Sequence, residues 1–277
     1  MAAIDLKAFD CDTSALPDWL AQFFAQSFAS AQSIAILVDV SSGGIELIHG
    51  MPRVLRALHA NTTKLAAAIK EDVELTRAEK GILEAEERAK LAEREFAQGF
   101  PLLNSFATVA VWSWLENSTK GLVALWIANR VDALSNPAVQ KLKLRLGDYL
   151  QTPESERGYL IADLLEQEQA SVLKRGVSRF QTLLDPFGLD ADVPKECTDA
   201  IFELQQVRNA IAHRAGVADR RFIADCPWLK AELNQRIAIS SEQFSKYALQ
   251  ALTYWRAVLA KAEAICARET GSPSQLT

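Results

Sequence analysis

The sequence has few of the residues that build metal sites and disulfide frameworks. Its 277 residues include four cysteines and three histidines, and the cysteines stand far apart, at positions 11, 197, 226 and 266. A zinc site needs closely spaced cysteine and histidine ligands, and no CxxC pair is present. We therefore predict no metal and no cofactor, and we expect free thiols in a reducing cytoplasm.

An excess of positive charge is also missing. Lysine and arginine number 30 against 35 aspartates and glutamates, for a formal net charge of −5. This balance argues against a protein that holds nucleic acid by bulk electrostatics, but it is compatible with a local basic site. The Gly43-Gly44 pair lacks the spacing and the lysine of a phosphate-binding loop.

The chain has no long uninterrupted apolar run. Its N-terminus, MAAIDLKAFDCD, lacks the basic start and apolar stretch of a secretory signal. The most apolar segment, 100–128, is interrupted by Glu116, Lys120 and Gly121, whereas a membrane-spanning helix needs about 20 apolar residues. We expect this segment to form the core, as two helical pieces or one kinked helix, in a cytoplasmic protein without a membrane span.

Segments of helical period dominate the sequence and predict an all-α fold. Pro17 opens a first helix that is expected to end near residue 31. Residues 34–48 hold two short apolar runs around Ser-Ser-Gly-Gly, which predicts a small β-hairpin. A short strand is expected at 236–239, and the polar tail 270–277 is expected to fray.

The segment 52–97 is rich in helix-forming and charged residues. Between residues 71 and 95 there are nine acidic and five basic side chains, but heptads are not sustained. We therefore favour an exposed helix that lies against its own domain; the alternative is a coiled-coil arm that binds a regulatory protein. Because composition changes most clearly at Gly99-Phe100-Pro101, we divide the chain into an N-terminal helical region, 1–99, and a helical bundle, 100–277.

Cap and proline signals predict the helices of the C-terminal part. Asn136-Pro137 is typical of a helix start, Gly216 of a helix end, and Ser240 with Gln243 of a capping box. The expected helices are 137–150, 153–184, 194–215 and 241–268. Trp112, Trp114 and Trp126 have apolar neighbours, which favours core positions over a base-stacking platform.

One segment of the expected helix 194–215 combines residue types suited to acid–base chemistry on RNA. It reads Arg-Asn-Ala-Ile-Ala-His, from Arg208 to His213. At about 100° per residue, Asn209 and His213 lie some 40° apart on one helix face, whereas Arg208 lies about 140° from His213. A neighbouring segment or a second subunit is therefore needed to complete a site.

These residues resemble the signature of the HEPN superfamily, an arginine, a polar residue and then a histidine four to six residues beyond the arginine. The resemblance covers about 100–268. It implies a HEPN-type helical bundle, here with an N-terminal helical extension, that cleaves RNA without a metal as a homodimer with facing motifs. The toxin or phage-defence role of such proteins follows as an expectation. We expect the dimer contact on the apolar faces at 109–128 and 244–259.

The chemistry is also consistent with elementary principles. RNA supplies its own nucleophile, the 2′-hydroxyl, so that no metal-bound water is required. A histidine transfers a proton near neutral pH, an arginine stabilises the charge on the phosphoryl oxygens, and Asn209 would orient His213 or hold a phosphate oxygen. Arg214, Arg220 and Arg221 add local positive charge and are candidates for contacts with the RNA backbone.

The alternative is a catalytically inactive helical interaction protein. In that case Arg208 would pair with Glu203 or another nearby carboxylate, and His213 would interact with the C-terminal end of its helix, where a cation is favoured. Arg220 and Arg221 follow Asp219 in an expected loop and could simply be solvated. The two other histidines, His49 and His59, are isolated in the sequence and are not site candidates.

Overall fold

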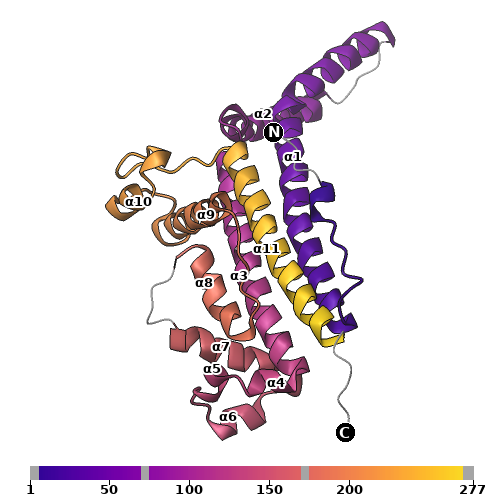
Figure 1. The fold of residues 1–277 in the computed structure, drawn as a ribbon. Coiled ribbons are helices and arrows are strands. Elements are labelled where there is room, and N and C mark those ends of the chain that lie inside the picture. The colour runs from indigo at the N-terminus through magenta and orange to yellow at the C-terminus, as the bar shows by residue number, and fades with distance from the viewer. Residues whose placement is uncertain (1–5, 70–74, 170–174, 271–277) are drawn as a thin grey trace, which may run out of the picture.

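The chain forms a bundle of helices from which a long helical hairpin extends (Figure 1). The computed structural model describes residues 6–69, 75–169 and 175–270. These residues form eleven α-helices and four short 3-10 helices, and they contain no β-strand. The prediction of an all-α fold is therefore confirmed. By length and composition one described helix, over Asp18–Lys64, is able to cross a membrane, although core helices also meet that criterion.

Eight helices set the architecture, and three short ones close the lower end of the bundle in Figure 1. The main helices are α1 (Asp18–Ile69), α2 (Leu75–Ala97), α3 (Pro101–Asn129), α7 (Arg157–Gln169), α8 (Val177–Leu184), α9 (Lys195–Arg214), α10 (Arg220–Asp225) and α11 (Ser241–Thr270). The short helices are α4 (Val131–Leu134), α5 (Pro137–Gln140) and α6 (Leu146–Gln151). The 3-10 turns are Leu6–Phe9, Glu154–Glu156, Asp185–Phe187 and Pro227–Leu229.

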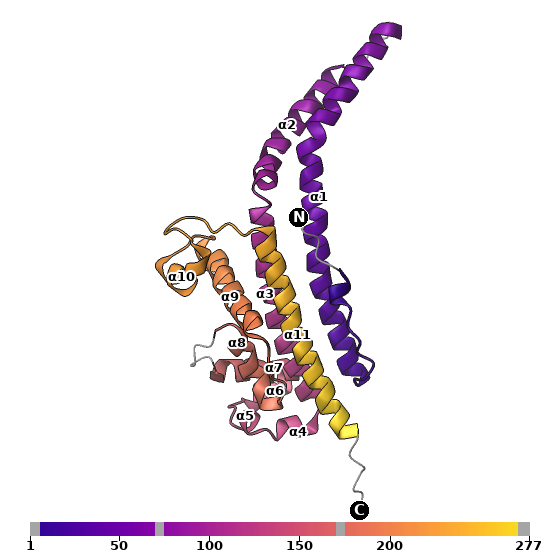
Figure 2. The same cartoon turned by 45° about the horizontal axis from the view of Figure 1, so that its top comes forward.

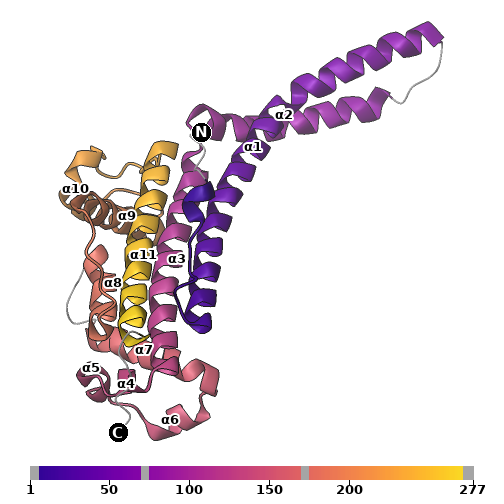
Figure 3. The ribbon, with the colours of Figure 1, turned by 45° about the vertical axis from the view of Figure 1, so that its right-hand side comes forward.

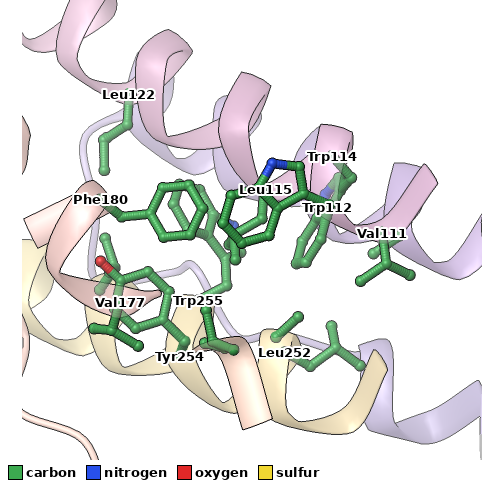
Figure 4. Close-up of a cluster of buried hydrophobic side chains, with 14 of the residues drawn as sticks. Val111, Trp112, Trp114, Leu115, Leu122, Val177, Phe180, Leu252, Tyr254 and Trp255 are labelled. Atoms are coloured by element: carbon green, nitrogen blue, oxygen red, sulfur yellow. The ribbon is translucent and has the colours of Figure 1, made fainter. Parts of the chain in front are cut away.

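Helix α3 lies at the centre and packs against α1, α7, α8, α9 and α11. Trp112 lies against Phe180 of α8, with ring centroids 5.0 Å apart, and Trp114 meets Trp255 of α11 edge-on at 6.3 Å (Figure 4). Such pairs contribute about 0.5–1.5 kcal/mol each beyond the burial of their area. Trp112, Trp114 and Trp126 are all buried, so their predicted place in the core is confirmed.

Apart from Phe100, which precedes it, the segment 100–128 lies in one continuous helix, and polar residues of this helix find partners inside the bundle. The hydroxyls of Ser27 and Ser118 lie 2.7 Å apart, which joins α1 to α3. The Trp114 indole donates to the Ser27 carbonyl at 2.8 Å. Polar groups are tolerated in a core when they are hydrogen-bonded, which explains why these residues do not interrupt the helix.

The hairpin predicted at 34–48 is wrong, because these residues lie within the 52-residue helix α1. Ala35, Val38 and Ser42 are buried at helical spacing on the face of α1 that packs inward. Helical packing of this face overrides the turn preference of the Gly43-Gly44 pair, since propensity is a weak constraint beside tertiary contacts. The first helix therefore does not end near residue 31.

Beyond the bundle, α1 continues as one leg of an antiparallel hairpin with α2 (Figures 2 and 3). Ala85 and Ala92 are buried along α2, and Arg56 pairs with Glu86 across the hairpin. The segment 52–97, which was expected to form one helix, belongs to two: its first part lies in α1 and its second part in α2. The connection at 70–74 lies outside the described residues. The hairpin is largely exposed, as the charge pattern predicts.

The composition change at residue 99 marks a turn. Gly99 and Phe100 adopt left-handed backbone angles, with φ of 72° and 63°, where α2 gives way to α3. Leu20, Phe24 and Phe28 belong to the same hydrophobic core as the C-terminal helices. The beginning of α1 is therefore built into the bundle, and only the hairpin stands apart from it.

Most C-terminal helix boundaries follow the local signals. Ser240 and Gln243 form the predicted capping box through two reciprocal hydrogen bonds of 3.1 Å. The Asn136 side chain caps α5, but that helix ends at Gln140 and not near residue 150. The expected helix 153–184 is divided into α7, which ends at Gln169, and α8, which starts after Gly176. The φ of 57° at Gly176 is incompatible with a right-handed helix. Residues 271–277 of the tail lie outside the described part.

Two further expectations for the C-terminal part are corrected. The strand at 236–239 is reduced to an isolated bridge between Arg236 and Val217 within the described residues. The apolar faces at 109–128 and 244–259 are buried in the core of the chain itself, as Leu115 and Trp255 illustrate. Neither face is available for the dimer contact expected from the sequence.

Gly158 provides a test of the packing between α7 and α3. A Cβ at this position would overlap the Ala124 carbonyl oxygen of α3, whereas one at Gly81 of α2 would meet nothing within 4 Å. We expect Gly158→Ala to lower the free energy of unfolding by about 1–3 kcal/mol, the usual cost of overpacking. The matched variant Gly81→Ala should be neutral or stabilising. Equal melting temperatures for the two variants would contradict this close approach of α7 and α3.

Candidate active site

The last two turns of α9 carry the three motif residues. The helix starts after Pro194 and ends where Ala215 and Gly216 take left-handed angles, with φ of 52° and 76°. One face of α9 is anchored in the core by buried side chains that include Leu204 and Val207. Arg208 and Asn209 are consequently half-buried, and His213 is exposed in the last turn.

Arg208, Asn209 and His213 line one cavity of about 280 Å³ within a single chain. Although Arg208 and His213 point 140° apart on an ideal helix, neighbouring helices enclose the space between them. Trp112 and Glu116 of α3 contribute to its wall. By helix geometry alone, the site needs either a neighbouring segment or a second subunit to complete it. Neighbouring segments of the same chain bring the three residues to one cavity.

Arg208 is held by polar contacts on one side and has an unused donor on the other. Its guanidinium donates to Asn209 Oδ1 at 3.2 Å and to Glu116 Oε2 at 3.3 Å. Its Nε atom is buried and has no hydrogen-bond partner among the described residues. Buried donors are rarely left unpaired, so this nitrogen is an exception among the polar groups around the cavity.

The suggested pairing of Arg208 with Glu203 does not occur. The buried Glu203 carboxylate accepts hydrogen bonds from Trp228 Nε1 at 2.6 Å, Lys246 Nζ at 3.1 Å and the Tyr247 hydroxyl at 2.7 Å. Burial and this hydrogen bond raise the pKa of Tyr247 well above its usual value, so that Tyr247 remains a donor. Glu203 therefore fixes α9 against α11 and does not enter the cavity, whereas Glu116 supplies the nearby carboxylate.

The cavity is rich in arginine. Arg175, Arg179 and Arg221 line it together with Arg208, and among the described residues Glu116 is the only acidic one in its lining. Arg175 and Arg221 pair with Asp225, at 2.8 and 3.7 Å. Arg179 pairs with Glu116 at 3.2 Å and with Glu166 at 3.1 Å. With Arg208, four guanidinium groups thus share three carboxylates. These ion pairs fix the guanidinium groups at the rim without neutralising all of their charge. The result is a local basic site in an acidic protein.

Arg175 and Arg179 are site residues that sequence reasoning missed. They precede the motif by about 30 residues and lie on either side of Gly176, at the start of α8. No motif marks them, because their place at the cavity depends on how α8 packs against α9. No local signal in the sequence identifies them, because Arg175 precedes α8 and only Arg179 belongs to the helix.

A second cavity of about 290 Å³ lies beside the first and shares four lining residues with it, Gln206, Asn209, His213 and Arg221. Arg214 lines this second cavity, where it pairs with Asp219 at 3.4 Å. The exposed Arg220 lines neither cavity. Of the three arginines predicted to bind RNA, the structure thus places Arg214 and Arg221 beside His213 but not Arg220.

The His213 side chain borders both cavities. Within the described residues no hydrogen bond or ion pair occupies its imidazole. Both ring nitrogens are therefore available for hydrogen bonds to a bound molecule. Its position in the last turn of α9 also suits the alternative role, since a cation there is stabilised by the helix dipole.

The cysteines do not provide a nucleophile. Burial raises the pKa of the Cys197 thiol to about 11 and that of the Cys226 thiol to about 12. Cys11 and Cys266 also have pKa values raised by burial, so that all four thiols stay protonated near neutral pH. In the described part of the chain, no group of three or more His, Cys, Asp or Glu side chains could hold a metal ion.

Comparison with known proteins adds no family to this description. No protein-family model, no curated protein and no solved structure matches the chain. The likeness to HEPN proteins therefore depends on the motif residues, and the functional argument depends on the cavity that they line.

Glu116→Gln tests whether the cavity is an anion site. The carboxylate neutralises part of the charge of Arg208 and Arg179 and would repel a phosphate, so we expect the variant to bind phosphate groups more tightly, by on the order of tenfold. The measurement is titration with a non-cleavable deoxyribodinucleotide, followed by NMR chemical shifts of His213. As a control, Glu156→Gln changes an exposed carboxylate that does not line the cavity. Equal affinities for the two variants would contradict an anion site at Arg208.

Proposed function

We propose that the chain is a metal-independent endoribonuclease of HEPN type that acts in the cytoplasm, with Arg208 and His213 as its reactive pair. The observation that supports this proposal is the single cavity lined by Arg208, Asn209 and His213 and bordered by further arginines. The His213 side chain, which makes no hydrogen bond within the described residues, and the Arg208 side chain line the same small cavity. That combination suits an anionic substrate that requires proton transfer.

The proposed reaction needs only groups that the RNA and this cavity supply. His213 accepts the proton of the 2′-hydroxyl as its oxygen attacks the neighbouring phosphorus. The bond from O2′ to phosphorus forms and the bond from phosphorus to O5′ breaks, while solvent protonates the departing O5′. The products are a 2′,3′-cyclic phosphate and a 5′-hydroxyl end. Alignment of the internal nucleophile provides much of the rate advantage.

The arginines take the second role in this mechanism. Arg208 would stabilise the additional negative charge on the phosphoryl oxygens in the transition state, and its Nε has no other partner to give up. Asn209, which accepts from Arg208, would keep the guanidinium oriented toward the phosphate. Arg175, Arg179, Arg214 and Arg221 would contact flanking phosphates, which position RNA without reading its sequence.

Such an activity would inhibit growth when unrestrained, so we propose a toxin or phage-defence role. A helical interaction module without activity is the second candidate. The ion pair of Arg208 with Glu116 is compatible with this second candidate, because a purely structural arginine would make the same contact. The two candidates differ in one respect, since an interaction module has no use for an imidazole that faces a basic cavity.

We expect RNA cleavage in excess EDTA, with 2′,3′-cyclic phosphate ends on the products. DNA of the same sequence should remain intact, because it lacks the 2′-hydroxyl. The measurement is gel analysis of labelled oligonucleotides, with mass spectrometry of the new ends. Strict dependence on magnesium or products with 5′-phosphates would exclude the proposed mechanism.

Substitutions at the motif should separate catalysis from folding. His213→Ala should lower the cleavage rate by ~10²–10⁴ and Arg208→Ala by about 10²–10³, the usual losses for a proton-transfer group and for one charge-stabilising donor. Both variants should remain folded, because His213 is exposed and because Glu116 keeps its ion pair with Arg179 when Arg208 is removed. Growth inhibition by the wild type should disappear with either substitution.

Arg220→Ala is the matched control for these variants, because Arg220 is exposed and lines neither cavity. It should retain cleavage within about threefold of the wild type, as expected for a surface charge whose effect is screened. Full activity in His213→Ala, or unfolding of both motif variants, would refute the assignment of this pair.

A further inference from the structure

Helix α1 has a second apolar face that no described residue of the chain covers. Its large side chains recur at alternating intervals of three and four residues, and we call this row the outer seam. The outer seam consists of Leu37, Val40, Leu47, Met51, Val54 and Leu58, with Gly44 at the one small position. The six large side chains are 41–71% exposed. The row has the spacing of a coiled-coil contact and spans about 33 Å.

The outer seam lies roughly 150° around the helix from the buried face with Val38 and Ser42. A helix that is apolar on opposite sides is normally covered on both. Here α2 and α3 cover one side only. The opposite side is exposed along the hairpin, which extends away from the bundle (Figure 3).

Three glycines beside the outer seam point to a close neighbour. Gly43, Gly44 and Gly50 lie inside α1, and a Cβ on any of them would meet nothing within 4 Å. Glycine destabilises a helix interior relative to alanine, and contacts within the chain do not require it here. Glycine in a helix allows another backbone to approach closely, and a second helix against the outer seam would use that property.

We propose that the outer seam binds the same seam of a second copy of the chain, with the two α1 helices antiparallel and centred near residue 49. The seam contains two sets of positions that each repeat every seven residues: 37, 44, 51 and 58, and 40, 47 and 54. In an antiparallel pair, residues of one set lie opposite residues of the other set. This register places Met51 opposite Leu47 of the second copy and Leu58 opposite its Val40. Gly44 then faces the larger Val54, so that a large side chain fills each small position.

The flanks of the outer seam fit the same register. On one side, Gly43 lies opposite Ala57 of the second copy, and Gly50 lies opposite the second Gly50, so that small residues meet along its length. Between residues 36 and 58, no seam or directly flanking position carries a charge. A two-fold axis that passes near residue 49 of both helices makes the two halves of the contact identical, as in most protein dimers.

The charges of α1 favour the antiparallel orientation. Asp39 and Glu46 lie in the first half of the outer seam region, and Arg53 and Arg56 lie in the second half. Antiparallel packing places Glu46 at the same height along the contact as Arg53 of the second copy. The small residues between them, such as Gly50, leave room for the two side chains to meet. A parallel pair would place Glu46 beside Glu46 and Gly44 opposite Gly44, which gives repulsion and a gap.

A lipid surface fits this face less well. Helices that lie on membranes are usually rich in lysine and arginine on their polar face. Here the polar positions between 36 and 58 hold two acidic and two basic residues, and α2 beside them contributes six acidic and five basic residues. The protein as a whole carries a net charge of −5. The alternating spacing of three and four residues is that of a coiled-coil contact, whereas binding to a lipid surface requires no register between two helices.

Cysteine cross-linking of the full-length protein tests both partner and register. Gly50→Cys should form a disulfide-linked dimer of twice 30.5 kDa under mild oxidation, because the two residues 50 lie opposite each other. Gly43→Cys should not, whereas the double variant Gly43→Cys with Ala57→Cys should. Wild-type protein, oxidised in parallel, controls for the four native cysteines. Cross-linking of both single variants would show a parallel pair and overturn the proposal.

Sedimentation at about 50 µM, well above a micromolar Kd, provides the second readout. The wild type should be dimeric, and Leu47→Glu should weaken association by on the order of 100-fold, since each interface would bury two unpaired charges. Leu83→Glu on α2 is the matched control, as an equally exposed leucine outside the outer seam, and should remain dimeric. A monomeric wild type would overturn the proposal. If that monomer binds phosphatidylcholine–phosphatidylglycerol vesicles and Leu47→Glu abolishes the binding, the outer seam faces lipid. Neither readout depends on RNA cleavage.

Discussion

The burial of α3 is the constraint on which the rest of the structure depends. This 29-residue helix has apolar side chains on all sides, so that it must be surrounded by other helices to be stable in water. Besides its chain neighbours α2 and α4, five described helices pack against it, and the aromatic contacts of Trp112 and Trp114 fix α8 and α11 relative to one another. The same helix presents Glu116 to the cavity, so that the packing of the core also sets the distance between α3 and Arg208.

The candidate site depends on this frame in a second way. Glu203 lies one helical turn and a half before Arg208, and its three hydrogen bonds fix α9 to α11 and to the loop with Trp228. A buried carboxylate must be satisfied in this manner, since an unpaired buried charge is costly. Catalytic groups act efficiently when neighbouring contacts hold them in place. The anchored half of α9 thus orients the half that carries Arg208 and His213.

The sequence was informative wherever a local rule decided the structure. The capping box at Ser240, the glycine after α9 and the core position of Trp112 follow from hydrogen-bond and burial preferences of single segments. It failed where tertiary contacts override such preferences, as in the helical continuation through Gly43-Gly44. The motif residues were found, but Arg175 and Arg179 were not, because only the packing of α8 brings them to the cavity. Whether Arg208 and His213 cleave RNA stays a prediction.

The most direct test is a crystal structure of the protein with a short RNA whose 2′-hydroxyl at the scissile position is replaced by hydrogen. Without the nucleophile the RNA cannot be cut, and the ground-state complex becomes observable. The account predicts one phosphate within hydrogen-bond distance of the Arg208 guanidinium. When an intact ribose is superposed on the bound deoxyribose, its O2′ atom should lie within hydrogen-bond distance of the His213 imidazole. RNA bound away from the cavity, or a phosphate held while His213 faces solvent, would contradict it.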